Sequence, residues 1–238
     1  AGSCWYFLYF ALNKAEKELL NESGDFSEQW KRVVAPKLKE FMPVDWYLGG
    51  AEHAVLHLLY ARFWVKAFKD VGLLDFDEPF VRLRSVGMVL AEDGRKMSKS
   101  WGNVISPDEV VKRYGADTLR IYEMFMGPWD QAIAWETRSL VGCYRFMEKV
   151  WKLANENVAQ KSDEELIAKL NKLIKKVGKD ILEQKFNTSI AGMMEFTNAW
   201  SKAKLGSEDL KKFLLILAPF APYISEEIWE NSGEKESI

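Results

Sequence analysis

The stretch RKMSKSWGN, residues 95–103, directly follows the pair Asp93-Gly94 and organises the interpretation of the whole chain. Asp-Gly is a strong turn signal, and the Gly and Asn that close the stretch tolerate unusual backbone angles. A basic loop with hydroxyls and free backbone N–H groups supplies the charges and donors that a polyphosphate binds. A solvated turn that happens to carry lysines is the alternative interpretation.

Composition limits the classes of protein to consider. The 238 residues allow one large domain or two of ordinary size, and 48% hydrophobic with 29% charged residues is a globular composition. Lys plus Arg (33) nearly balances Asp plus Glu (35), so any contact with RNA must use a local patch. Cys4 and Cys143 lie far apart without metal-ligand spacing, which favours a reducing, cytoplasmic location over a disulfide scaffold.

The sequence shows neither a membrane-spanning or signal segment nor a normal N-terminal start. The chain has no run of 18 apolar residues and no signal-peptide pattern, so we expect no membrane partner. It starts as AGSCWYFL, a dense apolar run without an initiator methionine. We therefore expect an excised piece of a longer protein or a naturally split subunit.

Residues 1–128 show the alternation of an α/β fold. A β-prone run at 43–48 ends in a tight turn at Gly49-Gly50, and a helix follows over 52–70. A second strand over 81–90 leads into the 95–103 loop, and helices over 107–114 and 116–126 follow. Ligands in such folds bind beyond the carboxyl ends of the strands. We therefore expect the two glycines and the loop to face one crevice.

The two histidines of the chain, His53 and His57, lie four residues apart at the predicted helix start, next to Glu52. A metal site is one interpretation, but no third ligand is evident and the glutamate is not placed as in zinc proteases. Histidines simply hydrogen-bonded at a helix start are a second interpretation. The third, which we favour, has these side chains facing a nucleotide or small substrate at the helix N-terminus. No protein-bound metal is predicted.

Residues 43–63, with GG-x-EHA followed by HLLY-x-RF, resemble the leucyl-tRNA synthetases, whereas the isoleucine and valine enzymes carry different residues here. KMSKS itself resembles the ATP-binding signature loop of the class I aminoacyl-tRNA synthetases. Further matching segments, from about Cys4 to Trp229, occur in the family's order: 87–90, 114–120, Trp135-Glu136, and Arg145-Phe146 with Val150-Trp151.

The resemblance implies roles for individual residues. Lys96 and Lys99 would be the catalytic residues, binding the ATP phosphates and stabilising charge as a carboxylate attacks the α-phosphorus, and Ser98 would donate from its hydroxyl. The remaining ATP-binding positions would be Met88 and Val89 at the adenine, Gly50 and Glu52 at the ribose, and His53. His53 and His57 would border the adenylate and leucine pocket. ATP with Mg²⁺, leucine and tRNA-Leu are the implied ligands.

The family's other signature, HIGH, does not occur in the 238 residues. It belongs to the first half of the nucleotide-binding fold, which precedes an inserted editing domain in the family. We therefore expect the missing N-terminal half to lie elsewhere in the same polypeptide or in a separate subunit. We also expect these residues alone to be nearly inactive in adenylate formation. The family's C-terminal RNA-contacting domain is missing as well, so tRNA affinity should be weak.

Residues 129–238 show helical periodicity, with helices over 137–160, 163–186, 188–203, 207–217 and 222–229 and short connections between them. The predicted fold class is thus α/β plus all-α: the second half of a Rossmann-type domain (1–128) followed by an antiparallel helical bundle (129–238), truncated, which by resemblance is the anticodon-binding domain. Lys172, Lys175, Lys176 and Lys179 could contact RNA phosphates or form a solvated face.

The predicted function is leucine–tRNA ligase, with the chain carrying part of the enzyme. Two alternatives remain. The chain could be an isoleucyl- or valyl-tRNA synthetase fragment, or a synthetase-derived protein that binds RNA or regulates without catalysis. An upstream HIGH segment would favour a synthetase, whereas a true start codon at residue 1 would favour the non-catalytic protein.

Overall fold

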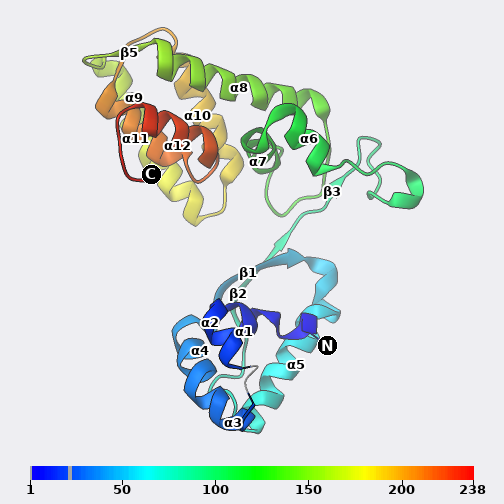
Figure 1. The fold of residues 1–238 in the computed structure, drawn as a ribbon. Helices are drawn as coiled ribbons and strands as arrows, with labels where there is room; N and C mark the ends of the chain where they lie inside the picture. The colour runs from blue at the N-terminus through cyan, green and yellow to red at the C-terminus, as the bar shows by residue number, and fades with distance from the viewer. Residues whose placement is uncertain (1, 21–22) are drawn as a thin grey trace. The chain divides into compact units, whose positions relative to one another are not determined.

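The computed structural model describes residues 2–20 and 23–238, which form two compact units, Ala1–Val86 and Gly87–Ile238 (Figure 1). Each unit has its own hydrophobic core. The boundary predicted between residues 128 and 129 concerns the domains of the resembled family and stays a prediction. No helix within the described residues is long and apolar enough to cross a membrane.

The first unit combines short helices with a two-stranded parallel sheet of β1 (Val44–Gly50) and β2 (Phe80–Val86). Trp46 pairs with Arg82 and Leu48 with Arg84 in this register. Ahead of β1 come η1 (Gly2–Cys4), α1 (Tyr6–Phe10), α2 (Lys14–Leu19), α3 (Phe26–Gln29), the π-helical turn η2 (Trp30–Val34) and α4 (Ala35–Phe41). Between the strands the chain forms η3 (Ala51–Val55) and α5 (His57–Asp70).

The core of this unit lies where α1, η2 and α4 meet α5. Its buried members are Phe7, Leu8, Leu12, Val33, Val34, Leu38, Ala61, Val65 and Leu74. Local signals fix the helix ends: Asn13 and Glu16 form a reciprocal capping box on α2, and Gly72 beyond α5 has a φ of 76°. The aromatic run at residues 5–12 is helical and only partly buried, since Phe10 is 70% exposed.

Two predicted elements of this region are wrong in detail. The helix over 52–70 is broken at Leu56, whose φ of −111° and ψ of −99° separate the 3₁₀ turn η3 from α5. Periodicity does not distinguish the two helix types over a single turn. The tight turn predicted at Gly49-Gly50 is absent, because both glycines continue β1 and the chain turns at η3.

The predicted strand over 81–90 is also two elements, β2 and β3 (Val89–Leu90), separated at Gly87. Here the chain passes directly against residues 129–131: the Gly87 N–H donates to the Trp129 carbonyl at 2.9 Å, and a Cβ on Gly87 would overlap the Gln131 carbonyl oxygen. β3 then pairs in parallel with β4 (Ile133–Ala134). A contact 40 residues away along the chain cannot be recognised from the local pattern.

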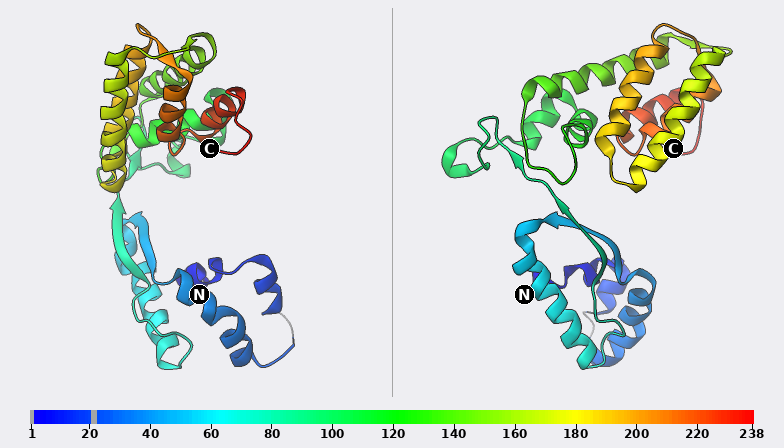
Figure 2. Two further views of the ribbon diagram at one scale, coloured as in Figure 1. Left: turned by 90° about the vertical axis from the view of Figure 1, so that its left-hand side faces the viewer. Right: turned by 180° about the vertical axis from the view of Figure 1, so that it is seen from behind.

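The second unit is predominantly helical (Figures 1 and 2). After the 3₁₀ turn η4 (Lys99–Trp101) come α6 (Pro107–Tyr114), α7 (Ala116–Phe125), α8 (Thr137–Glu156), α9 (Glu164–Leu182), α10 (Phe186–Trp200), α11 (Ser207–Leu217) and α12 (Pro222–Asn231). β5 (Val158–Ala159) and β6 (Leu205–Gly206) form a short parallel pair. The helices predicted here are present, with boundaries shifted by a few residues.

A single core runs through this unit, and Trp200, Tyr122, Phe213 and Phe220 are among its fully buried side chains. α7 is tied to the α11–α12 connection by polar groups. The buried Asp117 accepts from the Ile224 N–H at 2.7 Å, within the first turn of α12, and the Arg120 guanidinium donates to the Pro219 carbonyl at 3.0 Å. Burial raises the pKa of the Asp117 carboxyl.

Candidate functional site

The 95–103 loop is held by hydrogen bonds at its two ends. The Ala91 N–H donates to the Arg95 carbonyl at 2.8 Å, and Leu90 forms an antiparallel bridge with Lys96. On the far side, the Ser98 N–H donates to the Asn103 side-chain oxygen at 2.9 Å, and the chain leaves η4 through Gly102 with a φ of 65°. The amide of Asn103 thus caps the centre of the loop.

A second set of contacts links the residues before and after KMSKS. The Arg95 guanidinium donates to Asp93 Oδ2 from Nε at 2.8 Å and from Nη2 at 2.5 Å, and it stacks over the Trp101 ring at 4.5 Å. Arg95 also holds the pKa of the Asp93 carboxyl below its usual value. The charge of Arg95 is therefore committed to the loop itself.

Lys96 and Lys99 differ from Arg95 in their surroundings. Both side chains are exposed, and neither ammonium forms an ion pair with any carboxylate in the described part of the chain. Ser98 lies between them, with its hydroxyl 2.8 Å from that of Ser100. Met97, in contrast, is half-buried and packs against the core of the second unit. The loop therefore presents two solvent-exposed positive charges on a backbone held by hydrogen bonds, which is an arrangement suited to anions.

Met88 and Val89 lie beside this loop. The Ile133 N–H donates to the Met88 carbonyl at 3.0 Å, and the Trp135 N–H donates to the Leu90 carbonyl at 2.9 Å. Backbone groups alternate in direction along a strand, so those of Val89 point away from β4. The chain at Lys96 bridges to Leu90 along this same edge of β3, opposite β4.

The first unit holds the other predicted site residues. A cavity of about 700 Å³ lies between η1, the end of β1 and the start of α5, and Gly50, His53 and His57 line it. Glu52 is exposed on η3, and its carboxylate folds back over Gly50, where a Cβ would collide with it. The structure therefore brings these four residues together.

Tyr47 forms the centre of an aromatic hydrogen-bonded chain in this cavity, between Tyr6 and His57. The hydroxyl of Tyr47 lies 2.5 Å from His57 Nε2 and 2.5 Å from the hydroxyl of Tyr6. Burial, followed by the charge of His53, lowers the pKa of His57, and the Ser3 carbonyl partly opposes this. Burial and then the Tyr6 hydroxyl raise the pKa of Tyr47. Both shifts favour the uncharged forms of His57 and Tyr47.

Tyr6 and Tyr47 are site residues that the sequence interpretation missed. Neither was singled out from the sequence, although a tyrosine inside a β-prone run is a signal for a hydroxyl with a partner. Cys4 also lines the cavity and, like Cys143, is a free thiol. Burial raises the pKa of Cys143 to about 12.

The remaining predictions give a mixed picture. Among residues 2–20 and 23–238, no group of three or more His, Cys, Asp or Glu side chains is placed to hold a metal ion. The four lysines singled out on α9 are all exposed, but Lys176 and Lys179 pair with Asp180 and Glu183 one turn further on, whereas Lys172 and Lys175 form no ion pair within the described residues. The lysine row is thus partly neutralised by its own helix.

Comparison with known proteins identifies the relationship. Residues 23–136 match the family described as tRNA synthetases class I (I, L, M and V), and residues 163–238 match the anticodon-binding domain of tRNA ligase. The leucine–tRNA ligase of Pelodictyon phaeoclathratiforme is 46% identical over the whole chain, which spans 29% of that relative's length.

Solved structures agree. The chain matches LeuRS from Agrobacterium radiobacter, solved as a ternary complex with tRNA and LeuAMS, at 33% identity and a TM-score of 0.80 over 99% of this chain and 32% of that one. Two structures of Mycobacterium tuberculosis methionyl-tRNA synthetase with methionyl-adenylate share the fold at 15% identity, with TM-scores of 0.60 and 0.62. They cover 82% and 84% of this chain and 45% and 46% of theirs.

The fold and the KMSKS loop, together with these matches, define the class: the chain belongs to the class I aminoacyl-tRNA synthetases, which are ligases. Within that class its relationship is to the leucine–tRNA ligases, as the string at residues 43–63 indicates. The resemblance found in the sequence is thereby confirmed.

Proposed function

We propose that these residues supply the KMSKS half of a leucine–tRNA ligase active site, which activates leucine with ATP and transfers it to tRNA-Leu. The observation that carries the proposal is the pair of exposed ammonium groups of Lys96 and Lys99, which form no ion pair with the described residues, on a hydrogen-bonded loop. An anchored backbone with free charges lowers the entropic cost of gripping a triphosphate.

Lys96 and Lys99 act by electrostatics. As the leucine carboxylate attacks the α-phosphorus, negative charge moves onto the departing pyrophosphate, and the two ammonium groups stabilise it together with the Mg²⁺ that accompanies ATP. The Ser98 hydroxyl donates to a phosphate oxygen. This mechanism requires no covalent intermediate with the enzyme.

The other predicted residues bind the rest of the adenylate. The backbone of Val89, directed away from β4, and that of Met88 lie against the adenine, and Glu52 over Gly50 accepts from the ribose hydroxyls. His53 and His57 border the leucine side chain in the cavity of the first unit, where burial lowers the pKa of His57. A neutral, aromatic wall favours an aliphatic side chain.

A second polypeptide segment that bears HIGH completes this half-site, either in the same polypeptide or as a separate subunit. β1 and β2 form only a two-stranded parallel sheet, and parallel sheets are normally buried on both faces and extended by further strands. Apolar side chains around this sheet are exposed, among them Trp46 (42%), Leu48 (48%), Leu59 (56%), Phe63 (61%) and Leu83 (52%). We assign this surface to the first half of a Rossmann-type domain.

The helices from α8 onward form the antiparallel anticodon-binding bundle in this proposal, and Lys172 and Lys175 on α9 contact tRNA phosphates. Two lysines give a weak, salt-dependent interaction, so tRNA affinity depends on other parts of the enzyme. The free thiols of Cys4 and Cys143 fit a cytoplasmic location.

Amino-acid-dependent ATP–pyrophosphate exchange by the intact enzyme tests the function. We expect exchange with leucine, and exchange with valine, which lacks one methylene, reduced about 10- to 200-fold. A preference for isoleucine or valine would reassign the chain within the class. Binding of tRNA without exchange for any amino acid would instead favour the non-catalytic RNA-binding alternative.

A further inference from the structure

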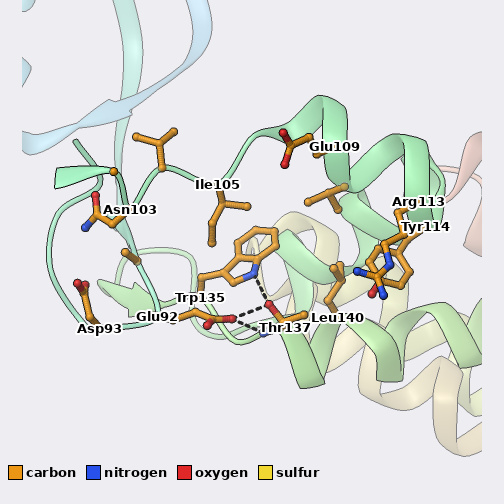
Figure 3. A pocket seen from close by; sticks show the side chains of 14 residues that line it. Glu92, Asp93, Asn103, Ile105, Glu109, Arg113, Tyr114, Trp135, Thr137 and Leu140 are labelled. Carbon is orange, nitrogen blue, oxygen red and sulfur yellow. Dashed lines mark hydrogen bonds between the residues drawn. The ribbon is translucent and has the colours of Figure 1, made fainter. Parts of the chain in front are cut away.

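A cavity at the base of the 95–103 loop is not used by the proposed reaction. It has a volume of about 570 Å³ and lies wholly within the second unit (Figure 3). Its walls are both stems of the loop (91–93 and 102–105), α6, and the start of α8. Lys96, Ser98 and Lys99 do not line it, and neither do the residues of the cavity in the first unit. Its size is that of a small-molecule site.

The floor of the cavity is apolar. Figure 3 shows the Trp135 ring at its centre, with Ile105 above and Leu140 beside Thr137. Trp135 is 7% exposed and Leu140 1%, so the floor is part of the packed core and will not collapse into the space. The indole N–H is already satisfied by the Thr137 hydroxyl at 3.2 Å. A ligand would therefore meet this floor through an apolar body.

The rim carries more negative than positive charge. Glu92, Asp93 and Glu109 line the cavity against a single guanidinium, that of Arg113. The charge of Asp93 is balanced by Arg95, so the remaining charges of the lining are two carboxylates, Glu92 and Glu109, and one guanidinium, Arg113. Glu92 accepts from the Thr137 hydroxyl at 2.5 Å through Oε1 and forms no ion pair within the described residues, nor does Glu109.

We propose that this cavity binds a small organic cation, a primary amine carried on an apolar or aromatic body. The body packs on Trp135, Ile105 and Leu140, and the ammonium lies at the rim, attracted by the carboxylates of Glu92 and Glu109. The affinity comes from charge complementarity together with burial of apolar surface. Either contribution alone would give weak binding at an exposed rim.

Binding there acts on the loop. The ligand touches residues 91–93 and 102–105 at once, and these are the stems that carry Lys96 and Lys99. It also bridges the stems to α6 and α8, so it stabilises the arrangement that it binds by mass action. The cavity is therefore a control point for the loop, separate from the substrates.

The test is calorimetric titration of the intact enzyme with 2-phenylethylamine, compared with the neutral 2-phenylethanol. We expect saturable amine binding that weakens with added salt, and alcohol binding at least about threefold weaker. Glu109→Gln and Glu92→Gln, which keeps an oxygen for Thr137, should each weaken the amine about threefold. Asp108→Asn is the matched control, because it removes a charge from the same turn of α6 without lining the cavity.

Three outcomes would overturn the proposal: no saturable binding of the amine, equal binding of the alcohol, or equal effects of Glu109→Gln and Asp108→Asn. A competition titration with leucine and ATP separates this site from the substrate cavity, since amine that is displaced by leucine is bound elsewhere. Because the cavity residues are not those of the proposed reaction, failure here would leave leucine-dependent exchange unchanged.

Discussion

At the scale of single residues, the account depends most on Lys96 and Lys99. Replacing either by Ala should lower the rate of ATP–pyrophosphate exchange by about 10²- to 10³-fold, as expected when one donor to developing charge is lost. Lys112→Ala provides the control, since Lys112 is an exposed lysine on α6 without an ion pair in the described chain. Equal losses for Lys112→Ala and Lys96→Ala would show a general charge effect and contradict the assignment.

Asn103 should matter through the loop backbone. Asn103→Ala removes the acceptor of the Ser98 N–H, which lies 2.9 Å away, and we expect the KM for ATP to rise about 2- to 10-fold with a smaller change in kcat. Asn103→Asp keeps the acceptor and should recover part of the affinity. Asn155→Ala, which removes an exposed side-chain bond on α8, should leave the KM unchanged. A KM for ATP that is insensitive to Asn103→Ala would contradict this role.

His57 predicts a pH dependence of stability. Its folded-state pKa is lowered by burial, so the folded protein binds fewer protons than the unfolded chain. The free energy of unfolding should therefore fall as pH drops below about 6.5 and level off below the folded pKa. Urea unfolding between about pH 8 and pH 5 measures this, and His57→Gln should remove that part of the slope. The same slope in both proteins would show that other groups cause it.

Motif spacing predicted residues that the structure brings together, but it did not predict the partners that position them. Lys96, Ser98 and Lys99, and separately Gly50, Glu52, His53 and His57, are recognisable because motif spacing reports which atoms a ligand needs. Asn103, Arg95 and Trp101 close the loop through contacts between its stems, and Tyr6 reaches Tyr47 from 41 residues away. Such contacts depend on tertiary structure and leave no local pattern.

At the scale of elements, helices with strong periodicity were predictable and elements shaped by a neighbour were not. α11 has the predicted bounds, 207–217, because Gly206, the acidic first turn and the apolar face all agree. The separation of β2 from β3 arises where Gly87 meets residues 129–131, and the break at Leu56 is a change of backbone angles that periodicity does not mark. Short elements contain too few residues for hydrophobic periodicity to predict their type and bounds.

Two glycines give an element-scale prediction. Gly87→Ala places a methyl group on the Gln131 carbonyl oxygen and should destabilise the second unit by about 1–3 kcal/mol. Gly142→Ala lies in α8 with open space around its Cβ and should stabilise it by about 0.5–1 kcal/mol. Urea midpoints of the two variants should move in opposite directions. A stabilising Gly87→Ala would show that the crossing with residues 129–131 is not tight.

At the scale of the whole molecule, composition and motif order predicted a two-part chain related to class I synthetases, and the family relationship is confirmed. The structure divides the chain at Val86 into two separately packed units. The predicted crevice shared by Gly49-Gly50 and the loop involves residues of both units and stays a prediction. Local sequence motifs indicate the family relationship, whereas the division into two packed units depends on tertiary contacts that no local motif records.

The two-stranded sheet leads to the central claim, because the described residues add no further strand to it, whereas parallel sheets are normally larger and covered on both faces. The most direct test is leucine-dependent ATP–pyrophosphate exchange by residues 1–238 mixed with a separate polypeptide that carries the HIGH half. We predict little exchange by either alone, exchange by the mixture, and its loss when the 1–238 chain carries Lys96→Ala and Lys99→Ala. Near-full exchange by residues 1–238 alone, or exchange by the mixture that survives the double substitution, would contradict the account.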